Sequence, residues 1–298
     1  MNNFHTPVLL KEITETLEAS SGRKYIDATF GGGGHTARIL ELGGTVLGID
    51  LDEESLEYGR KKFSKEISDG KLILQKGNFK EIDEIARLNN FTKVSAVIFD
   101  LGVSSHQIDT PERGFSFLRQ GPLDMRMDKG SQITAEVLVN LLTKGELNDL
   151  FNRLGQEHRF RAISDGIVRS RRIKAIKTTG ELSDIVHKAY GLKGEVSDFV
   201  KTKVNKKVFQ ALRIAVNGEL ENITEALPKA IDLLEEKGKI IVITFHSLED
   251  GIVKKSFKDF EEKNMGKVIT AKPILPVKEE LNKNSRARSA KLRVFEKS

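Results

Sequence analysis

The chain has 298 residues, of which 38% are hydrophobic and 31% charged, and it contains no cysteine. Its length allows one large domain or two smaller ones with a real core. The lack of cysteine excludes disulfides, cysteine-ligated zinc, iron–sulfur clusters and a cysteine nucleophile. No apolar run is long enough to cross a bilayer, and the N-terminus lacks the pattern of a secretory signal, so we expect a cytoplasmic protein with no membrane partner.

The net charge of +6 is unevenly spread along the chain. Residues 150–213 hold 15 Lys and Arg against 6 Asp and Glu, and residues 263–298 hold 10 against 3, which leaves −10 for the rest. An acidic body with two basic segments is typical of a protein that binds a polyanion such as RNA. A solvated basic face would give the same counts, so charge alone leaves both readings open.

The first part of the chain alternates between strand-like and helix-like segments. Helices are expected at 36–42, 53–67 and 78–88. Short runs rich in Val, Ile and Leu predict five strands, at 24–30, 45–50, 71–77, 95–102 and 239–246. Continuously apolar strands that alternate with helices predict a doubly wound, mostly parallel α/β sheet covered on both faces. Two further short strands are expected at 267–270 and 292–296.

No strand pattern interrupts the region between the fourth and fifth strands. Helices are expected there at 134–142, 145–153, 158–171 and 179–190, and one long helix at 208–236 leads into the fifth strand. The sequence therefore predicts a mostly helical domain at 108–207, inserted into a discontinuous domain made of residues 1–107 and 208–298.

Four consecutive glycines at 31–34 follow the first strand and precede a helix, with His35 at the start of that helix. Glycine in a regular element costs about 0.5–1 kcal/mol, so the bare main chain should serve a purpose. At this place in a doubly wound sheet it lets a ligand approach the backbone closely. The third glycine of a dinucleotide fingerprint is replaced by Thr36.

Two carboxylates are expected at the same edge of the sheet as the glycines. Asp50 ends the second strand, where a carboxylate can accept both hydroxyls of a ribose, and Asp100 ends the fourth. Phe79 follows the third strand, where a side chain can border an adenine. Glycines needed only for a turn, and carboxylates that cap helices, would give the same pattern.

Three classes of protein fit these features. The first is a nicotinamide-dependent oxidoreductase and the second a transferase that uses S-adenosylmethionine, since both cofactors carry an adenosine ribose. The third is a non-catalytic RNA-binding or ribosome assembly protein on a nucleotide-binding fold. The missing third glycine and the RNA-like charge favour the transferase.

Longer motifs extend almost from end to end of the chain. They include D-A-T-F-G-G-G-G-H at 27–35, F-D-L-G-V-S-S at 99–105, G-P-L-D-M-R-M-D at 121–128, T-F-H-S-L-E-D at 244–250 and N-S-R-A-R-S-A-K-L-R at 284–293. H-T-P-V-L-L-K-E at 5–12 and R-G-F-S-F at 113–117 belong to the same set. In these motifs the chain closely resembles the bacterial 16S ribosomal RNA cytosine-N4 methyltransferases. A further motif of the set is V-F-Q-A-L-R-I-A-V-N-G-E-L at 208–220. The chain departs from the usual family pattern at His106, at Gly251 and at 204–207, just before this motif.

The resemblance implies a Rossmann-like class I methyltransferase domain with S-adenosylmethionine as cofactor. It also implies methylation of a cytosine amine in the decoding region of small-subunit ribosomal RNA, free or in a partly assembled subunit. The cofactor contacts that it implies are Gly33, Gly34 and His35 at the methionine end, Asp50 at the ribose, Phe79 near the adenine, and Asp100 and Gln107 closing the pocket. A homodimer is left open by the sequence.

The residue types bear on the chemistry independently. Carbon-5 methylation of a pyrimidine by the usual route needs a cysteine nucleophile, which this chain lacks, whereas an exocyclic amine needs only alignment and a hydrogen acceptor. Asp100 is the candidate acceptor, and holding the cofactor's amino group is its alternative role. No metal is needed, and we expect Asp124, Arg126 and Asp128 to form an ion-pair loop.

Contacts to RNA are expected from aromatic and basic side chains. Phe115 and Phe117 are candidates to stack a flipped cytosine, or else to anchor their loop to the core. His246, at the end of the fifth strand, is a substrate contact or a helix cap. Basic side chains that would meet phosphates are Arg113, Arg169, Arg171, Arg172, Lys174, Arg286, Arg288, Lys291 and Arg293.

Overall fold

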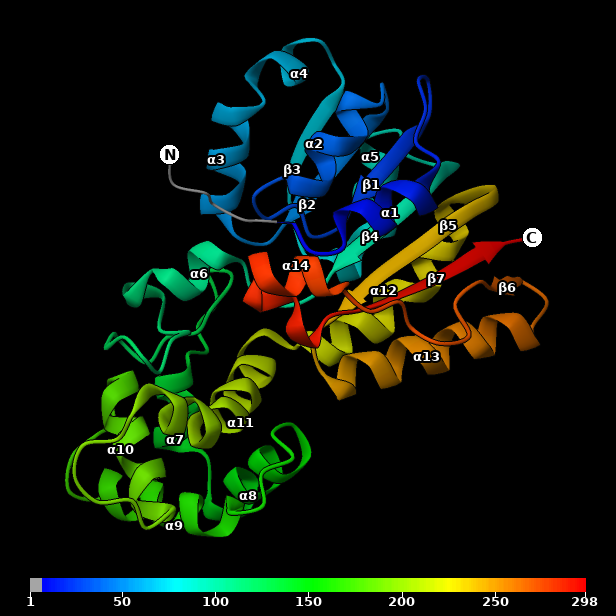
Figure 1. Cartoon of the computed structure of the whole chain (residues 1–298). Coiled ribbons are helices and arrows are strands. Elements are labelled where there is room, and N and C mark those ends of the chain that lie inside the picture. Colours follow the sequence, from blue (N-terminus) through cyan, green and yellow to red (C-terminus); the bar gives the residue numbers. More distant parts are fainter. Residues whose placement is uncertain (1–6) are drawn as a thin grey trace. The chain divides into compact units, whose positions relative to one another are not determined.

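The computed structural model describes residues 7–298 (Figure 1). The first two residues of the H-T-P-V-L-L-K-E motif, His5 and Thr6, lie outside this range. The chain forms two compact units, the first made of Met1–Ser104 with Leu220–Ser298 and the second of Ser105–Glu219.

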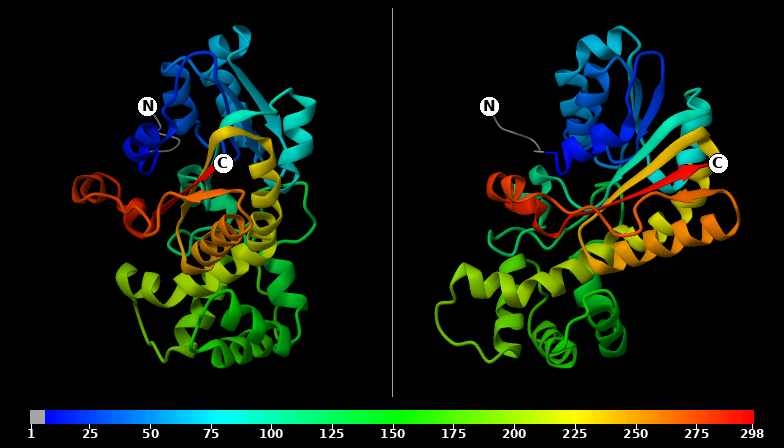
Figure 2. Two further views of the ribbon diagram at one scale, coloured as in Figure 1. Left: turned by 90° about the vertical axis from the view of Figure 1, so that its right-hand side faces the viewer. Right: turned by 45° about the vertical axis from the view of Figure 1, so that its right-hand side comes forward.

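The first unit is built on a seven-stranded sheet with the order β3-β2-β1-β4-β5-β7-β6 (Figures 1 and 2). The strands are β1 (Lys24–Asp27), β2 (Thr45–Asp50), β3 (Leu72–Lys76), β4 (Val94–Asp100), β5 (Leu234–Thr244), β6 (Gly266–Val268) and β7 (Lys291–Lys297). The first five are parallel, and β7 runs antiparallel to both of its neighbours. The predicted doubly wound, mostly parallel fold is therefore confirmed.

Helices cover both faces of this sheet, as the apolar strands require. One face packs against α1 (Leu10–Leu17), α2 (Gly34–Glu41) and α3 (Glu53–Lys62), with α4 (Ser64–Ser68) following α3. The other packs against α5 (Ile82–Leu88), α12 (Glu219–Leu233) and α13 (Ser247–Glu262). Successive strand residues serve opposite faces: Tyr25 belongs to the first cluster and Ile26 to the second.

The second unit is helical. Its helices are α6 (Ser105–Asp109), α7 (Ala135–Leu141), α8 (Lys144–Arg153), α9 (Phe160–Arg171), α10 (Thr179–Ala189) and α11 (Asp198–Asn217). The division after Glu219, rather than near residue 208, follows from packing, since α11 contacts α7, α8 and α10 along its length. Among the described residues of this unit, the β-pairing is a single bridge between Pro122 and Thr178.

The single long helix predicted at 208–236 is wrong. Gly218 has a φ of 60° and ends α11, and α12 starts at the next residue. Glycine is the residue that adopts this left-handed geometry at a helix end without strain. The helix predicted at 53–67 is likewise divided at Phe63 into α3 and α4. No helix among residues 7–298 combines the length and hydrophobicity that a membrane crossing demands.

Candidate functional site

The glycine run forms the turn between β1 and α2. Gly31 and Gly33 have φ values of 51° and 66°, in the left-handed region that other residues avoid. A Cβ at Gly33 would lie 2.5 Å from the ring of Phe63, and one at Gly34 would lie 2.9 Å from Pro7. Backbone conformation and close packing therefore both require glycine here. No side chain caps the amino end of α2, so its first amides are left for other acceptors.

Two side chains from other elements fix this turn. Asp50, at the end of β2, accepts hydrogen bonds from the main-chain amides of Gly31 (2.6 Å) and Asp52 (2.8 Å). Lys62 of α3 donates to the carbonyl of Gly32 at 3.1 Å. Burial raises the pKa of Asp50 to about 7 and lowers that of Lys62. Each Asp50 oxygen keeps lone pairs, so the carboxylate can still accept a ligand's hydroxyls.

Asp100 and His35 meet at the end of β4. The main-chain amide of Asp100 donates a hydrogen bond to the hydroxyl oxygen of Thr29 (2.7 Å), and His35 Nε2 lies 3.4 Å from Asp100 Oδ2. Oδ1 of Asp100 is buried and accepts no hydrogen bond from the described residues. A buried polar atom without a partner costs about 1–3 kcal/mol, so this oxygen is suited to a ligand's N–H donor.

A further carboxylate, that of Asp27 at the end of β1, interacts electrostatically with both His35 and Asp100. It is 1% exposed and accepts a hydrogen bond from Thr36 Oγ1 at 2.7 Å. Burial raises the pKa of Asp27. Burial would lower the pKa of His35, but Asp100 and the other nearby carboxylates outweigh it and raise that pKa above its ordinary value.

Phe79 begins a short 3-10 helix (Phe79–Glu81) directly after β3. Its ring is half-buried and meets the ring of Phe99 edge-on, with 5.6 Å between the centroids. Asn78 caps this turn by accepting a hydrogen bond from the Lys80 amide at 3.0 Å. Phe79 therefore presents part of an aromatic ring at the end of β3, beside the strand that carries Asp50.

The structure thus gathers Gly33, Gly34, His35, Asp50 and Asp100 at the ends of β1, β2 and β4 in one unit. The contacts of Lys62, Thr29 and Asp27 were not anticipated from the sequence. They join residues from separate elements, and no local pattern marks them. The remaining predicted cofactor contact, Gln107, lies in α6 of the second unit, where it is 4% exposed.

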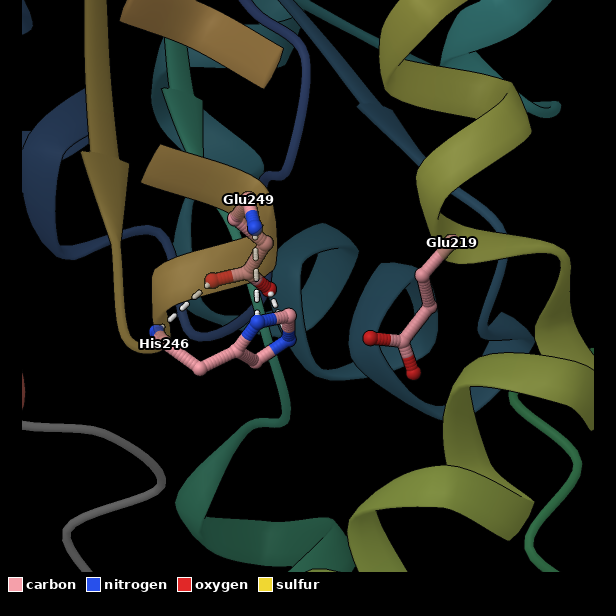
Figure 3. Close-up of side chains that lie close together, drawn as sticks. All are labelled: Glu219, His246 and Glu249. Atoms are coloured by element: carbon pink, nitrogen blue, oxygen red, sulfur yellow. Dashed lines mark hydrogen bonds and ion pairs between the residues drawn. The ribbon is translucent and has the colours of Figure 1, made fainter. Parts of the chain in front are cut away.

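His246 serves as the amino-terminal cap of α13 (Figure 3). Its Nδ1 accepts a hydrogen bond from the Glu249 amide at 3.3 Å, and its Nε2 lies 3.0 Å from Glu249 Oε1. The Glu249 side chain in turn accepts a hydrogen bond from the His246 amide at 3.2 Å. His246 and Glu249 therefore form a capping box, and the ring interacts with the end of its own helix.

Arg293 differs from the phosphate contact expected of it. It is 6% exposed, and its Nε lies 2.6 Å from Oδ1 of Asp250. Lys291 reaches the other oxygen of Asp250 at 3.0 Å. These contacts join β7 to the first turn of α13. Arg286 and Arg288, in the short helix Ser285–Ser289, are exposed.

In the second unit, the aromatic and basic candidates differ in what they touch. Arg113 is 3% exposed and donates to the carbonyls of Arg126 (3.0 Å) and Met127 (3.2 Å). Phe115 is buried beside it, whereas Phe117 is half-buried and meets Phe209 edge-on at 5.3 Å between centroids. Arg113 and Phe115 thus hold their own loop together.

The loop after Phe117 contains the expected ion pair. Arg126 donates to both oxygens of Asp124, at 2.7 Å and 2.8 Å. Although burial alone would raise it, the pKa of Asp124 lies below its usual range because these hydrogen bonds favour the carboxylate. Elsewhere in the unit, Arg171 donates to the Val139 carbonyl at 2.7 Å, while Arg169 and Arg172 are exposed.

Comparison with known proteins identifies the family to which this chain belongs. The model of the MraW methylase family matches residues 2–298. A protein named ribosomal RNA small subunit methyltransferase H, from Coprothermobacter proteolyticus, is 40% identical over 100% of this chain and 98% of its own length. Proteins of the same name are 43% identical in Caldicellulosiruptor saccharolyticus, covering 98% of this chain and 99% of the relative, and 45% identical in Persephonella marina, covering 97% and 98%.

Proposed function

Because the chain belongs to the MraW methylase family, we propose that it transfers a methyl group from S-adenosylmethionine to the exocyclic N4 amine of a cytosine in the decoding region of small-subunit ribosomal RNA. The observation that carries this proposal is the full-length similarity, at 40–45% identity, to relatives named ribosomal RNA small subunit methyltransferase H. The choice of cytosine N4 rests on the motifs that resemble the cytosine-N4 methyltransferases.

The residues at the carboxyl edge of the sheet fit this cofactor. Asp50 has lone pairs left for two ribose hydroxyls after binding its two main-chain amides. The amino end of α2 has no side-chain cap, so its first amides can bind a ligand's acceptor, and Phe79 offers an aromatic surface for the adenine. The bare carboxylate oxygen of Asp100 needs a donor, and both the cofactor and the target base carry amino groups.

When bound, S-adenosylmethionine supplies a methyl group on a positively charged sulfur. The protein's own contribution is to align the accepting amine and to take up its hydrogen. We assign this acceptor role to Asp100, because one of its oxygens is buried without a partner. Alignment is worth about 7–11 kcal/mol of the barrier, so no covalent step is required.

Recognition of the RNA is assigned to exposed cations and one aromatic ring. Arg286, Arg288, Arg169 and Arg172 are exposed and suited to phosphates, whose contacts give affinity without sequence choice. Phe117 keeps part of its ring accessible for a base. Gln107, Arg113, Phe115 and His246 stay predictions, and the contacts above already occupy Arg113 and His246.

The test is to incubate the chain with labelled S-adenosylmethionine and small ribosomal subunits from a strain that lacks the enzyme, and then to map the modified nucleotide by mass spectrometry. Label at one cytosine N4 is the expected result. Label at carbon 5 or on another base, or RNA binding without transfer, would overturn the proposal. Naked 16S RNA and partly assembled subunits serve as alternative substrates, and sedimentation tests for a homodimer. A ribosomal substrate also implies a cytoplasmic location.

A further inference from the structure

The imidazole of His35 is enclosed by acidic groups and has no role in the function proposed so far beyond lying near the cofactor loop. It is the second residue of α2 and is 5% exposed. Its Nε2 lies 3.4 Å from Asp100 Oδ2, and neither ring nitrogen makes a closer hydrogen bond to a described residue. The ring therefore has one near neighbour of opposite charge.

Three carboxylates from three different elements act on this ring. They are Asp100 of β4, Asp27 of β1 and Glu280 of α14 (Lys278–Lys283). His35 lies at the amino end of α2, and the partial positive charge of this helix end disfavours a protonated imidazole. The carboxylates outweigh both this effect and burial, so the pKa of the imidazole lies above its ordinary value.

Two of the three carboxylates are anchored by other donors. Asp27 accepts the Thr36 hydroxyl at 2.7 Å, and Glu280 accepts the main-chain amide of Leu9 at 2.8 Å. Asp100 has only its main-chain amide anchored, by Thr29 at 2.7 Å. The side chain of Asp100 therefore depends on His35 for its orientation.

We propose that His35 is a positioning residue, whose imidazolium binds Oδ2 of Asp100 and so keeps Oδ1 as the acceptor for an N–H group of the ligand. The inference rests on the proposed function for the identity of that ligand. It does not require His35 to touch the reacting atoms. Opposite charges held near each other in a buried site fix the carboxylate more firmly than a neutral donor does.

The predicted consequence is a pH dependence of cofactor affinity with two limbs. Asp50, whose pKa is about 7, must lose its proton to accept the ribose hydroxyls strongly, so affinity rises as the pH increases through that value. His35 must keep its proton, so affinity falls again as the pH rises through its elevated pKa. The amino group of the cofactor also titrates at alkaline pH, so the part of the alkaline limb that depends on the imidazole reports on His35.

The test measures S-adenosylhomocysteine affinity by calorimetry from pH 6 to pH 9 in the full chain and in His35→Gln. Glutamine keeps a donor but cannot carry the charge. We expect His35→Gln to bind about tenfold more weakly at pH 7, in line with a lost charge-assisted hydrogen bond, and to show a smaller alkaline limb while keeping the acidic one. His158→Gln, at an exposed site, is the matched control and should leave both limbs unchanged.

A second measurement does not depend on a variant folding. Nitrogen-15 NMR of the imidazole in the unmutated chain should show a pKa of His35 above its ordinary value of 6.5. A pKa at or below 6.5, or an alkaline limb of unchanged size in His35→Gln, would overturn the inference. Both readouts use cofactor product without RNA, so they stay informative if methyl transfer to the small subunit is not observed.

Discussion

The two units divide the charge of the molecule unequally. Residues 105–219 hold 20 Lys and Arg against 14 Asp and Glu, so this unit carries the whole net charge of +6, whereas the first unit holds 29 of each. The first unit buries acidic side chains at strand ends, and the second exposes basic ones on helices. The buried carboxylates of the first unit suit the proposed cationic cofactor, and the exposed cations of the second unit, together with Arg286 and Arg288 of the first, suit the proposed polyanion.

The candidate residues of the two units also differ in how much of their hydrogen-bonding capacity the protein itself fills. Asp100 and Asp50 keep acceptor capacity that a ligand can fill. Arg113 donates hydrogen bonds to carbonyls of its own loop, and Phe115 is buried beside it. A buried group with spare capacity indicates a ligand, whereas a buried group whose capacity is filled indicates a structural role.

The largest effect is expected from Arg113→Ala in the second unit. It leaves the carbonyls of Arg126 and Met127 without their buried donor, which should lower the free energy of unfolding by about 3 kcal/mol. Chemical denaturation measures this, with Arg153→Ala, at an exposed site, as control. Cofactor affinity should change little. A loss below about 0.5 kcal/mol would contradict the structural reading of Arg113.

Next comes Asp50→Ala in the first unit. Cofactor affinity should fall about 30-fold, or about 2 kcal/mol, because the ribose acceptor and the anchor of the Gly31 amide are both lost. Calorimetry with S-adenosylhomocysteine checks it, and Asp69→Ala supplies an exposed carboxylate as control. RNA affinity should be unaffected. An equal loss of cofactor and RNA affinity would contradict the assignment of Asp50 to the cofactor alone.

A smaller effect concerns the pH dependence of stability without cofactor. The pKa of Asp50 is raised from 3.8 in the unfolded chain to about 7, so its contribution is fully present below pH 4 and is lost as the pH rises to 7. We expect a loss of roughly 1.5 kcal/mol, allowing for solvent screening at this half-buried site. Asp50→Asn should remove this pH-dependent loss of stability. Identical stability profiles of the two proteins would argue against the raised pKa.

The smallest effect is expected from surface cations. Arg286→Gln with Arg288→Gln, and separately Arg169→Gln with Arg172→Gln, should each weaken RNA binding several-fold. Each pair should also reduce the slope of log affinity against log salt by about 1.4. Filter binding across a salt series measures both, and Lys272→Gln is a single-charge control. If only one pair changes the slope, RNA contacts are confined to that unit.

Local patterns allowed most elements to be predicted. The first four strands and the helices between them follow from apolar runs bounded by polar residues, and β6 and β7 lie close to the positions expected. The prediction of one long helix was wrong at Gly218. The sequence around a lone glycine does not show whether its φ will be positive. The start of β5 at Leu234 was missed, because E-E-K-G reads as a helix end and a turn.

Side-chain roles were harder to predict than positions. Arg293 was assigned to phosphates because it lies in a basic tail, but Asp250, far away in the sequence, binds it within the fold. Such contacts join β7 to α13, and no spacing in the chain predicts them. His246 was expected to be either a substrate contact or a helix cap, and it caps α13 because Glu249 stands three residues later and completes a capping box with it.

The amino-acid sequence by itself determined the α/β class, the glycine turn, the two carboxylates at strand ends and the family. Those features rest on periodicity, on backbone freedom at glycine and on motifs, all of which are local in the chain. Only the tertiary structure decided which polar groups are consumed by the protein and which are left for a ligand. Hydrogen bonds such as that from the Asp100 amide to Thr29, and ion pairs such as that of His35 with Asp100, form between elements that only folding brings together.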